Sequence, residues 1–171
     1  LLFHTNAPNR GNGGVALTLE EERELLKLIA DSKCDDVIKH SLIFLLYTGI
    51  RRSELASAII EDGFVSVICA KNRKNYIEKR RIIPITPMLA KWMHVFKLEK
   101  MRTVRPDALT QAMKRLMPNH HLHELRHTFI TRCQECGVPR EVVSVWAGHA
   151  ADNTQTSNVY THFSREFLKR E

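Results

Sequence analysis

Hydrophobic side chains recur at helical spacing through most of the chain, and the polar residues between them mark where helices begin and end. Thr18 and Glu21 form a capping box, which predicts a helix start just ahead of an apolar stripe. A second helix is expected to begin at Asp35 or Asp36 and to stop at Gly49. The same patterns predict further helices at 53–58, 88–96, 107–117 and 122–136, and one from Pro139 through Trp146.

The pattern changes to β-branched runs over 64–69 and 81–85. These runs bracket a polar, strongly basic stretch, and so predict two strands of a small antiparallel sheet joined by a long hairpin loop. Pro84 indicates an edge strand or a strand end, because proline cannot donate to a sheet ladder. The expected fold class is therefore α+β, mostly helical, with one small sheet. We expect residues 15–171 to form one domain and residues 1–14, rich in Asn, Gly and Pro, to be a flexible linker.

Composition narrows the class of protein only slightly. The 26 Lys and Arg residues outnumber 19 Asp and Glu, which gives a formal net charge of +7. This sign favours a polyanionic partner such as nucleic acid, although many soluble proteins are equally basic. The sequence holds no apolar run long enough to predict a membrane span. Its four cysteines lack the spacing of a disulfide framework, which favours reduced thiols and a cytoplasmic protein.

The segment His123-Glu124-Leu125-Arg126-His127 contains the most informative candidate chemistry. His-Glu-x-x-His is a metalloprotease pattern, in which two imidazoles one turn apart bind zinc. In the alternative interpretation, His123 and Arg126 lie three residues apart on one helix shoulder and bind a phosphate, since a guanidinium forks onto two phosphate oxygens. A surface histidine and arginine on a core helix would show the same spacing, so this segment alone does not decide the function.

Other segments favour the phosphate interpretation. Arg51 follows a glycine turn in Thr48-Gly49-Ile50-Arg51-Arg52-Ser53-Glu54-Leu55, at a predicted helix N-terminus that favours anions. Ala147-Gly148-His149 places another histidine beyond a helix, and Tyr160 follows eleven residues later. With these boxes in this order, the chain resembles the catalytic domain of the tyrosine recombinase (phage integrase) family. The resemblance covers roughly residue 15 to the end. It implies that the reaction needs no metal. The zinc-like pattern would then be a coincidence, and Glu124 an ordinary intervening residue.

The resemblance implies a role for each matching residue. The implied catalytic residues are Arg51, Lys71, His123, Arg126, His149 and Tyr160, with Lys74 as a rival of Lys71 because the hairpin begins Ala70-Lys71-Asn72. Arg51 and Arg126 would stabilise the negative charge on the phosphate, and the histidines would add hydrogen bonds. His123 is the candidate base for the phenol, and the lysine would protonate the leaving oxygen. We further expect DNA contacts from Arg52, Arg73, Lys74, Lys79 and Arg80.

The implied activity is the breaking and rejoining of double-stranded DNA through a 3′-phosphotyrosine, without a metal, ATP or another cofactor. Family members work as tetramers on two duplexes, so a homotetramer on DNA and a monomer in its absence are expected. The chain would be part of the integration or excision system of a mobile element or phage in a bacterial cytoplasm, with 1–14 as the linker from an N-terminal core-binding domain. A type IB topoisomerase-like enzyme, a non-catalytic DNA-binding module and a zinc hydrolase remain as alternatives.

Overall fold

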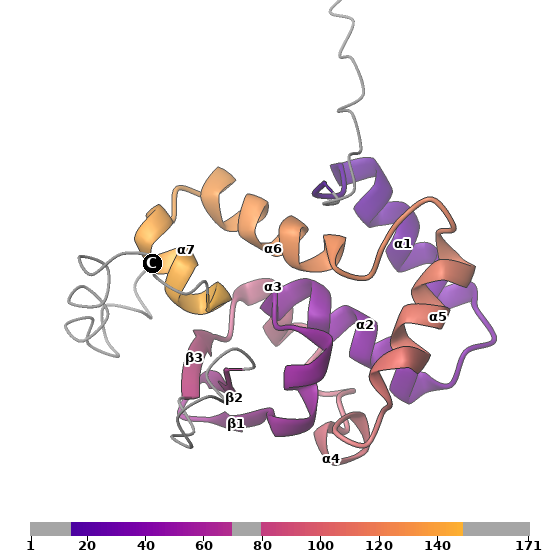
Figure 1. Cartoon of the computed structure of the whole chain (residues 1–171), viewed down its shortest axis with the longest axis horizontal. Coiled ribbons are helices and arrows are strands. Elements are labelled where there is room, and N and C mark those ends of the chain that lie inside the picture. The colour runs from indigo at the N-terminus through magenta and orange to yellow at the C-terminus, as the bar shows by residue number, and fades with distance from the viewer. Residues whose placement is uncertain (1–14, 70–79, 149–171) are drawn as a thin grey trace, which may run out of the picture.

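The computed structural model describes residues 15–69 and 80–148, and all structural statements below concern these residues. Figure 1 shows a mostly helical molecule with one small sheet, which confirms the predicted fold class. The elements in chain order are α1 (Leu19–Asp31), α2 (Asp36–Thr48), the 3-10 helix η1 (Arg52–Ser57), β1 (Ile59–Glu61), β2 (Phe64–Ile68), β3 (Arg80–Pro84), α3 (Pro87–Ala90), α4 (Leu98–Met101), α5 (Pro106–Leu116), α6 (Glu124–Glu135) and α7 (Arg140–Ala147).

The first two helices begin and end at the residues that the sequence marks. At the start of α1, the Glu21 amide donates to the Thr18 hydroxyl, and the Thr18 amide donates to the Glu21 carboxylate. Asp35 caps α2 by accepting from the Val37 amide at 2.7 Å. Gly49 ends α2 with a φ of 62°, a left-handed conformation that glycine adopts without steric cost. These predictions are confirmed.

Helix α2 forms the centre of the hydrophobic core. Every residue from Ser41 to Thr48 is buried, and the helix contacts α1, α3, α4, α5 and α6. Figure 1 shows α6 and α7 on one side of α2, α5 and α1 at one end, and the sheet at the other. Because Gly49 and Arg51 follow directly on this buried helix, the core fixes the point from which they leave it.

The sheet has three antiparallel strands in the order β1-β2-β3, one more than predicted. Strand β1 has only three residues, too few to show an alternating pattern, and it pairs Ile60 with Val65 of β2. Strand β3 is the other edge strand, and Pro84 is its last residue, as expected of a residue that cannot donate to the ladder.

The prediction of a helix over 88–96 was wrong for most of its length. Helix α3 ends at Ala90, and the amides of Trp92, Met93 and Val95 donate to the third residue before them, so tight turns replace helical hydrogen bonds. The side chains of Trp92, Met93 and Phe96 pack against the core from these turns, and α4 follows as an unpredicted short helix. In the part of the chain that is described, every helix is too short or too polar to cross a bilayer.

Candidate functional site: a basic pocket

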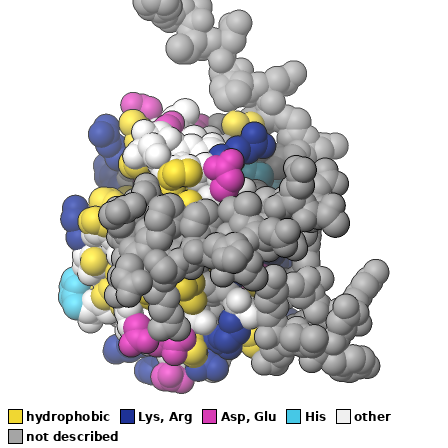
Figure 2. Space-filling model, turned by 90° about the vertical axis from the view of Figure 1, so that its left-hand side faces the viewer, with side chains coloured by type: hydrophobic (Ala, Val, Ile, Leu, Met, Phe, Trp, Pro, Cys, Tyr) yellow, Lys and Arg dark blue, Asp and Glu magenta, His cyan; other side chains and the backbone are white. Residues whose placement is uncertain are grey.

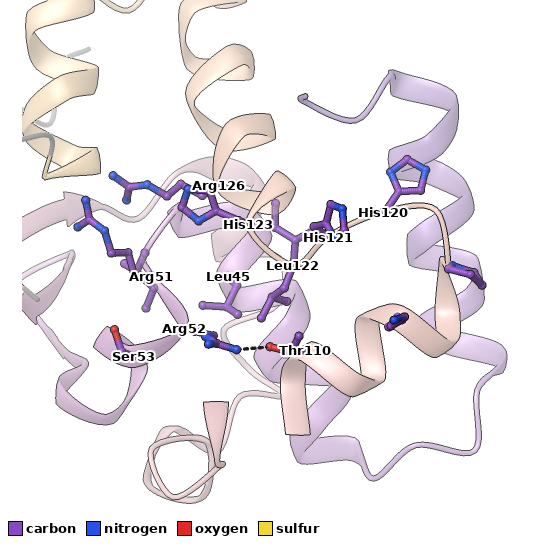
Figure 3. A pocket seen from close by; sticks show the side chains of 14 residues that line it. Leu45, Arg51, Arg52, Ser53, Thr110, His120, His121, Leu122, His123 and Arg126 are labelled. Carbon is purple, nitrogen blue, oxygen red and sulfur yellow. Dashed lines mark hydrogen bonds between the residues drawn. The ribbon is translucent and has the colours of Figure 1, made fainter. Parts of the chain in front are cut away.

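A pocket of about 520 Å³ lies between the end of α2, helix η1, α5 and the start of α6. Its walls include Arg51, Arg52, Lys114, His123 and Arg126, and none of its described lining residues is acidic. In Figure 3 the side chains of Arg51, Arg126 and His123 lie together at one end of this pocket. The structure therefore brings together three of the six predicted catalytic residues from positions up to 75 apart in the sequence.

Arg51 is placed by the turn that follows α2. Gly49 lies against the Phe129 ring, and a Cβ atom at this position would be 2.3 Å from Phe129 Cδ1, so only glycine fits. The Arg51 guanidinium donates from Nη1 to Glu54 Oε1 at 3.0 Å and from Nη2 to the Gly148 carbonyl at 3.2 Å. Two of its five N–H groups are used in these contacts, and the others can serve an anion in the pocket.

Arg126 is almost fully buried on α6, with 3% of its surface exposed. It donates from Nη1 to the Gly49 carbonyl at 2.7 Å and from Nη2 to the Ala147 carbonyl. Desolvation by burial, together with the positive charges of Arg51 and Arg81, lowers the pKa of Arg126 to about 10. The guanidinium still carries its charge at neutral pH, and an anion in the pocket would relieve the repulsion that lowers its pKa.

Glu54 and Arg81, neither of which was among the predicted site residues, complete a buried charge cluster. The Glu54 carboxylate, 1% exposed, accepts from Arg51 and from both terminal nitrogens of Arg81, at 2.9 and 2.6 Å. It also accepts from the Arg51 amide at 2.7 Å. Burial alone would lower the pKa of Arg81, but its hydrogen bonds with Glu54 and the Glu54 charge raise that pKa above its ordinary value.

The C-terminal end of α7 holds all three arginines of the cluster. The carbonyls of Trp146, Ala147 and Gly148 accept from Arg81, Arg126 and Arg51, respectively. The last carbonyls of a helix lack partners within it and carry partial negative charge, so they favour cations. Gly148 has a φ of 61°, and a Cβ atom there would lie 2.9 Å from Arg81 Nε, so both its conformation and its neighbour require glycine.

His123 lies at the N-terminal end of α6, exposed at the pocket rim, while Arg126 one turn later is buried. Its ring meets that of His127 edge to face, with centroids 4.9 Å apart. Desolvation and the nearby His127, Arg126 and Arg51 lower the pKa of His123 below its ordinary 6.5. The imidazole is therefore neutral at physiological pH and able to accept a proton.

Glu124 is not the ordinary intervening residue that the sequence analysis expected. Its carboxylate is 2% exposed and bonds His120 Nδ1 at 2.8 Å. Figure 3 shows His120 at the far end of the pocket from His123, so Glu124 is engaged with a different part of the fold from the two histidines of the zinc pattern. The described residues hold no cluster of three His, Cys, Asp or Glu side chains that could bind a metal ion.

The remaining predicted site residues divide into two groups. Arg52 is exposed at the pocket wall and donates to the Thr110 hydroxyl, as Figure 3 shows, with Asp107 3.6 Å away. Arg80 is exposed on β3 and bonds Ser66 and the Ser57 carbonyl. Lys71, Arg73, Lys74, Lys79, His149 and Tyr160 lie outside the described residues, so the choice between Lys71 and Lys74 stays open.

This chain is similar in sequence to curated tyrosine recombinases. The chain is 28% identical over 179 residues to the tyrosine recombinase XerA of Pyrococcus furiosus, an alignment that covers 90% of this chain and 59% of the relative. It is 30% identical over 161 residues to XerD of Haemophilus influenzae, covering 76% and 52%. The chain thus spans about half the length of these curated relatives, which include an archaeal as well as a bacterial protein. No protein-family model matches the chain.

Solved structures show the same fold. A lambda integrase dimer bound to a COC′ core site superposes with a TM-score of 0.64 at 16% identity, covering 87% of this chain and 62% of that one. A lambda integrase tetramer bound to a Holliday junction superposes with a TM-score of 0.58 at 16% identity, covering 81% and 48%. Together with the curated relatives, these matches confirm the resemblance seen in the sequence. The chain belongs to the tyrosine recombinase/integrase family and has the fold of its catalytic domain.

Proposed function

We propose that this protein breaks and rejoins double-stranded DNA through a covalent 3′-phosphotyrosine, with Tyr160 as the nucleophile. The observation that carries the proposal is the convergence of Arg51, Arg126 and His123 on one pocket whose described lining has no acidic side chain. These residues supply what phosphodiester exchange needs: fixed cations for the non-bridging oxygens and a neutral base for the phenol.

The charge of the buried cluster fits the reaction. Three guanidinium groups lie around one carboxylate, which bonds two of them, so the net charge around the pocket end is +2. A phosphodiester carries one negative charge, and attack by a phenolate gives a five-coordinate phosphorus with two. The cluster therefore matches the transition state better than the ground state, which is the condition for catalysis rather than mere binding. On the face shown in Figure 2, Lys and Arg side chains lie in several separate places around the edge of the described surface.

His123 is suited to remove the proton from Tyr160. A free phenol has a pKa near ~10, so its oxygen is a weak nucleophile until a base takes its proton. Because the pKa of His123 is lowered, its ring is unprotonated when the reaction starts. The positive charges of Arg51 and Arg126 would then stabilise the phenolate beside the phosphate.

We assign the remaining steps to residues outside the described part of the chain. Lys71 or Lys74 protonates the 5′-oxygen as it leaves, and His149 adds a hydrogen bond to the phosphate. Because the tyrosyl ester keeps the energy of the broken bond, a 5′-hydroxyl can reseal the strand without ATP or a metal. His149 follows directly on Gly148 in the sequence, and the Gly148 carbonyl is bonded to Arg51, which supports its place at this site.

We further propose that a homotetramer acts on two DNA duplexes in the cytoplasm, for integration or excision of a mobile element. Lambda integrase has this fold and forms a tetramer on a Holliday junction, which supports the assembly. Arg52, Arg73, Lys74, Lys79 and Arg80 would contact the DNA backbone. The exposed position of Arg52 at the pocket wall supports its share of that role.

The activity can be tested without knowing the recombination site. The purified protein is incubated with labelled duplexes that carry one nick within a randomised stretch, in the presence of a chelator and without ATP. Cleavage near the nick releases a short fragment that diffuses away, so the covalent adduct accumulates and survives detergent. Sequencing the trapped DNA then identifies the preferred site.

Two of the three tyrosines of the chain provide the comparison. Tyr47 is buried, and desolvation together with the Glu22 charge raises its pKa to about 12, so it is a poor nucleophile. We expect adducts with the native chain and with Tyr47→Phe, and none with Tyr160→Phe. Adducts that persist in Tyr160→Phe, or a native chain that forms none, would overturn the proposal.

A further inference from the structure

Arg81 is a buried arginine near the pocket that does not line it. It lies on the edge strand β3 with its side chain 5% exposed, and its guanidinium reaches toward η1 and the end of α7. It forms a bidentate pair with Glu54, donates from Nε to the Trp146 carbonyl at 2.8 Å, and lies 3.7 Å from Cys69 Sγ. Glu54 and the end of α7, which Arg81 bonds, are also the groups that accept hydrogen bonds from the pocket arginines Arg51 and Arg126.

Two of these contacts bear directly on Arg51. Glu54 is the carboxylate that Arg51 also binds, and Gly148, which accepts from Arg51, packs against the Arg81 side chain. With Arg81 absent, Glu54 would lose the guanidinium that bonds both of its oxygens and holds it in place for Arg51, and the net charge of the cluster would fall from +2 to +1. The end of α7 would also lose one of its three anchors.

Stability alone is a weak explanation for this arrangement. A buried ion pair often contributes no more than a hydrophobic contact of equal size, because desolvation offsets the attraction. Here the third guanidinium also adds repulsion, since Arg81 is one of the charges that lower the pKa of Arg126 to about 10. A fold that holds three cations around one anion is set up to receive a second anion.

We propose that Arg81 is a positioning residue for DNA cleavage. It neutralises Glu54 and anchors the end of α7, so that Arg51 keeps both its place and its charge for the scissile phosphate. This inference rests on the proposed function, and it adds a residue that does not touch the reacting atoms. Arg81 acts through Arg51, so its loss should resemble a weaker form of the loss of Arg51.

The test compares two phosphates at one cleavage site. Duplexes with the site recovered from the adduct experiment are made with a normal scissile phosphate or with a methylphosphonate, in which a methyl group replaces one non-bridging oxygen and removes the negative charge. Attack by Tyr160 on either substrate breaks the bond to the 5′-oxygen and forms a tyrosyl ester. The neutral substrate builds up less charge in the transition state, so it depends less on Arg51.

We expect Arg81→Met to lower the cleavage rate on the normal phosphate by ~10²-fold, which is the low end of the cost of removing a transition-state donor. On the methylphosphonate the rate should fall by only ~3-fold. Arg81→Lys, which can keep one charged contact to Glu54, should recover about one power of ten on the normal phosphate. Equal losses on the two substrates would show that Arg81 serves the fold alone and would overturn the inference.

A matched control separates this effect from lost stability. Arg132 is a half-buried arginine that, like Arg81, joins separate elements: it bonds Glu22, Glu135 and the Leu17 carbonyl, and it does not line the pocket. We expect Arg132→Met to lower the melting temperature while the cleavage rate of the folded protein stays native on both substrates. If Arg132→Met shows the same substrate-dependent loss as Arg81→Met, the effect is not specific to Arg81 and the inference fails.

A second measurement needs no DNA and keeps this inference separate from the proposed function. Hydrogen exchange of the Arg51 Nη1 and Nη2 protons, followed by NMR, reports how firmly that guanidinium is held, because these nitrogens bond Glu54 and the Gly148 carbonyl. We expect exchange to accelerate by ~10-fold in Arg81→Met and to stay native in Arg132→Met, as for a group released from a buried hydrogen-bonded network. Unchanged exchange would refute the positioning of Arg51 by Arg81, even in a protein that forms the phosphotyrosine. Absent adducts with accelerated exchange would refute only the proposed function.

Discussion

Replacing Gly49 by alanine should destabilise the protein well beyond the usual cost of losing a left-handed glycine. The φ of 62° costs an L-residue about 1–2 kcal/mol. The added Cβ would also lie 2.3 Å from Phe129 Cδ1 and 2.8 Å from Cγ, so the ring or the turn must move. Overpacking of this kind typically costs about 1–3 kcal/mol. We therefore expect Gly49→Ala to lower the free energy of unfolding by about 2–5 kcal/mol.

Gly137 is a matched control for the backbone cost. Its φ is 84°, and a Cβ atom there would meet nothing within 4 Å, so Gly137→Ala should show the conformational cost without a clash. Urea unfolding followed by tryptophan fluorescence gives both free energies by linear extrapolation. The difference between the destabilisation by Gly49→Ala and that by Gly137→Ala isolates the clash with Phe129. In a double-mutant cycle, Phe129→Leu should remove most of this extra destabilisation. Equal costs for the two glycine variants would refute the steric explanation.

The remaining predictions concern the charges of the site. Glu54→Gln should lower the free energy of unfolding by about 3–5 kcal/mol, because it leaves the buried Arg81 and the half-buried Arg51 without their carboxylate. A cost below ~1 kcal/mol in urea unfolding would contradict the buried pairing. Arg51→Met should raise the pKa of His123 toward its ordinary value, because it removes one positive charge that disfavours the protonated ring; an NMR titration in which that pKa stays or falls would contradict this. Arg52→Ala should weaken DNA binding equally across sequences and reduce the slope of log affinity against log salt by about one, whereas an unchanged slope would argue against a phosphate contact.

The sequence predicted the helix ends that are set by residues close together in the chain. The capping box at Thr18 and the turn at Gly49 are made by neighbours in the chain, so the sequence alone determines them. The interval 88–96 failed because Trp92 and Phe96 pack onto the core from tight turns, and packing of this kind overrides helical periodicity. Strand β1 was missed because its pairing with β2, and not its three residues, defines it.

The motif boxes predicted which residues meet at the pocket but not what supports them. Arg51, His123 and Arg126 were expected to converge, and they share one pocket, although their catalytic roles are still predictions. Arg81 was expected only as the first residue of the second strand, next to the basic hairpin loop. One signal could have identified it: in a strand with two-residue alternation, Arg81 lies on the same face as the buried Ile83. A charged residue on the buried face of a strand requires a buried partner, which is Glu54.

The end of α7 explains how residues from distant segments form one cluster. Helix ends leave carbonyls without partners. The carbonyls of the last two residues of α7 and of its cap Gly148 bond arginines from β3, from α6 and from the turn after α2. The hydrogen bonds that complete the helix end are therefore the same bonds that orient the positive charges. Disturbing this helix end would displace all three guanidinium groups together, whereas a change at one arginine leaves two in place. The geometry of the pocket and the stability of the end of α7 therefore depend on the same hydrogen bonds.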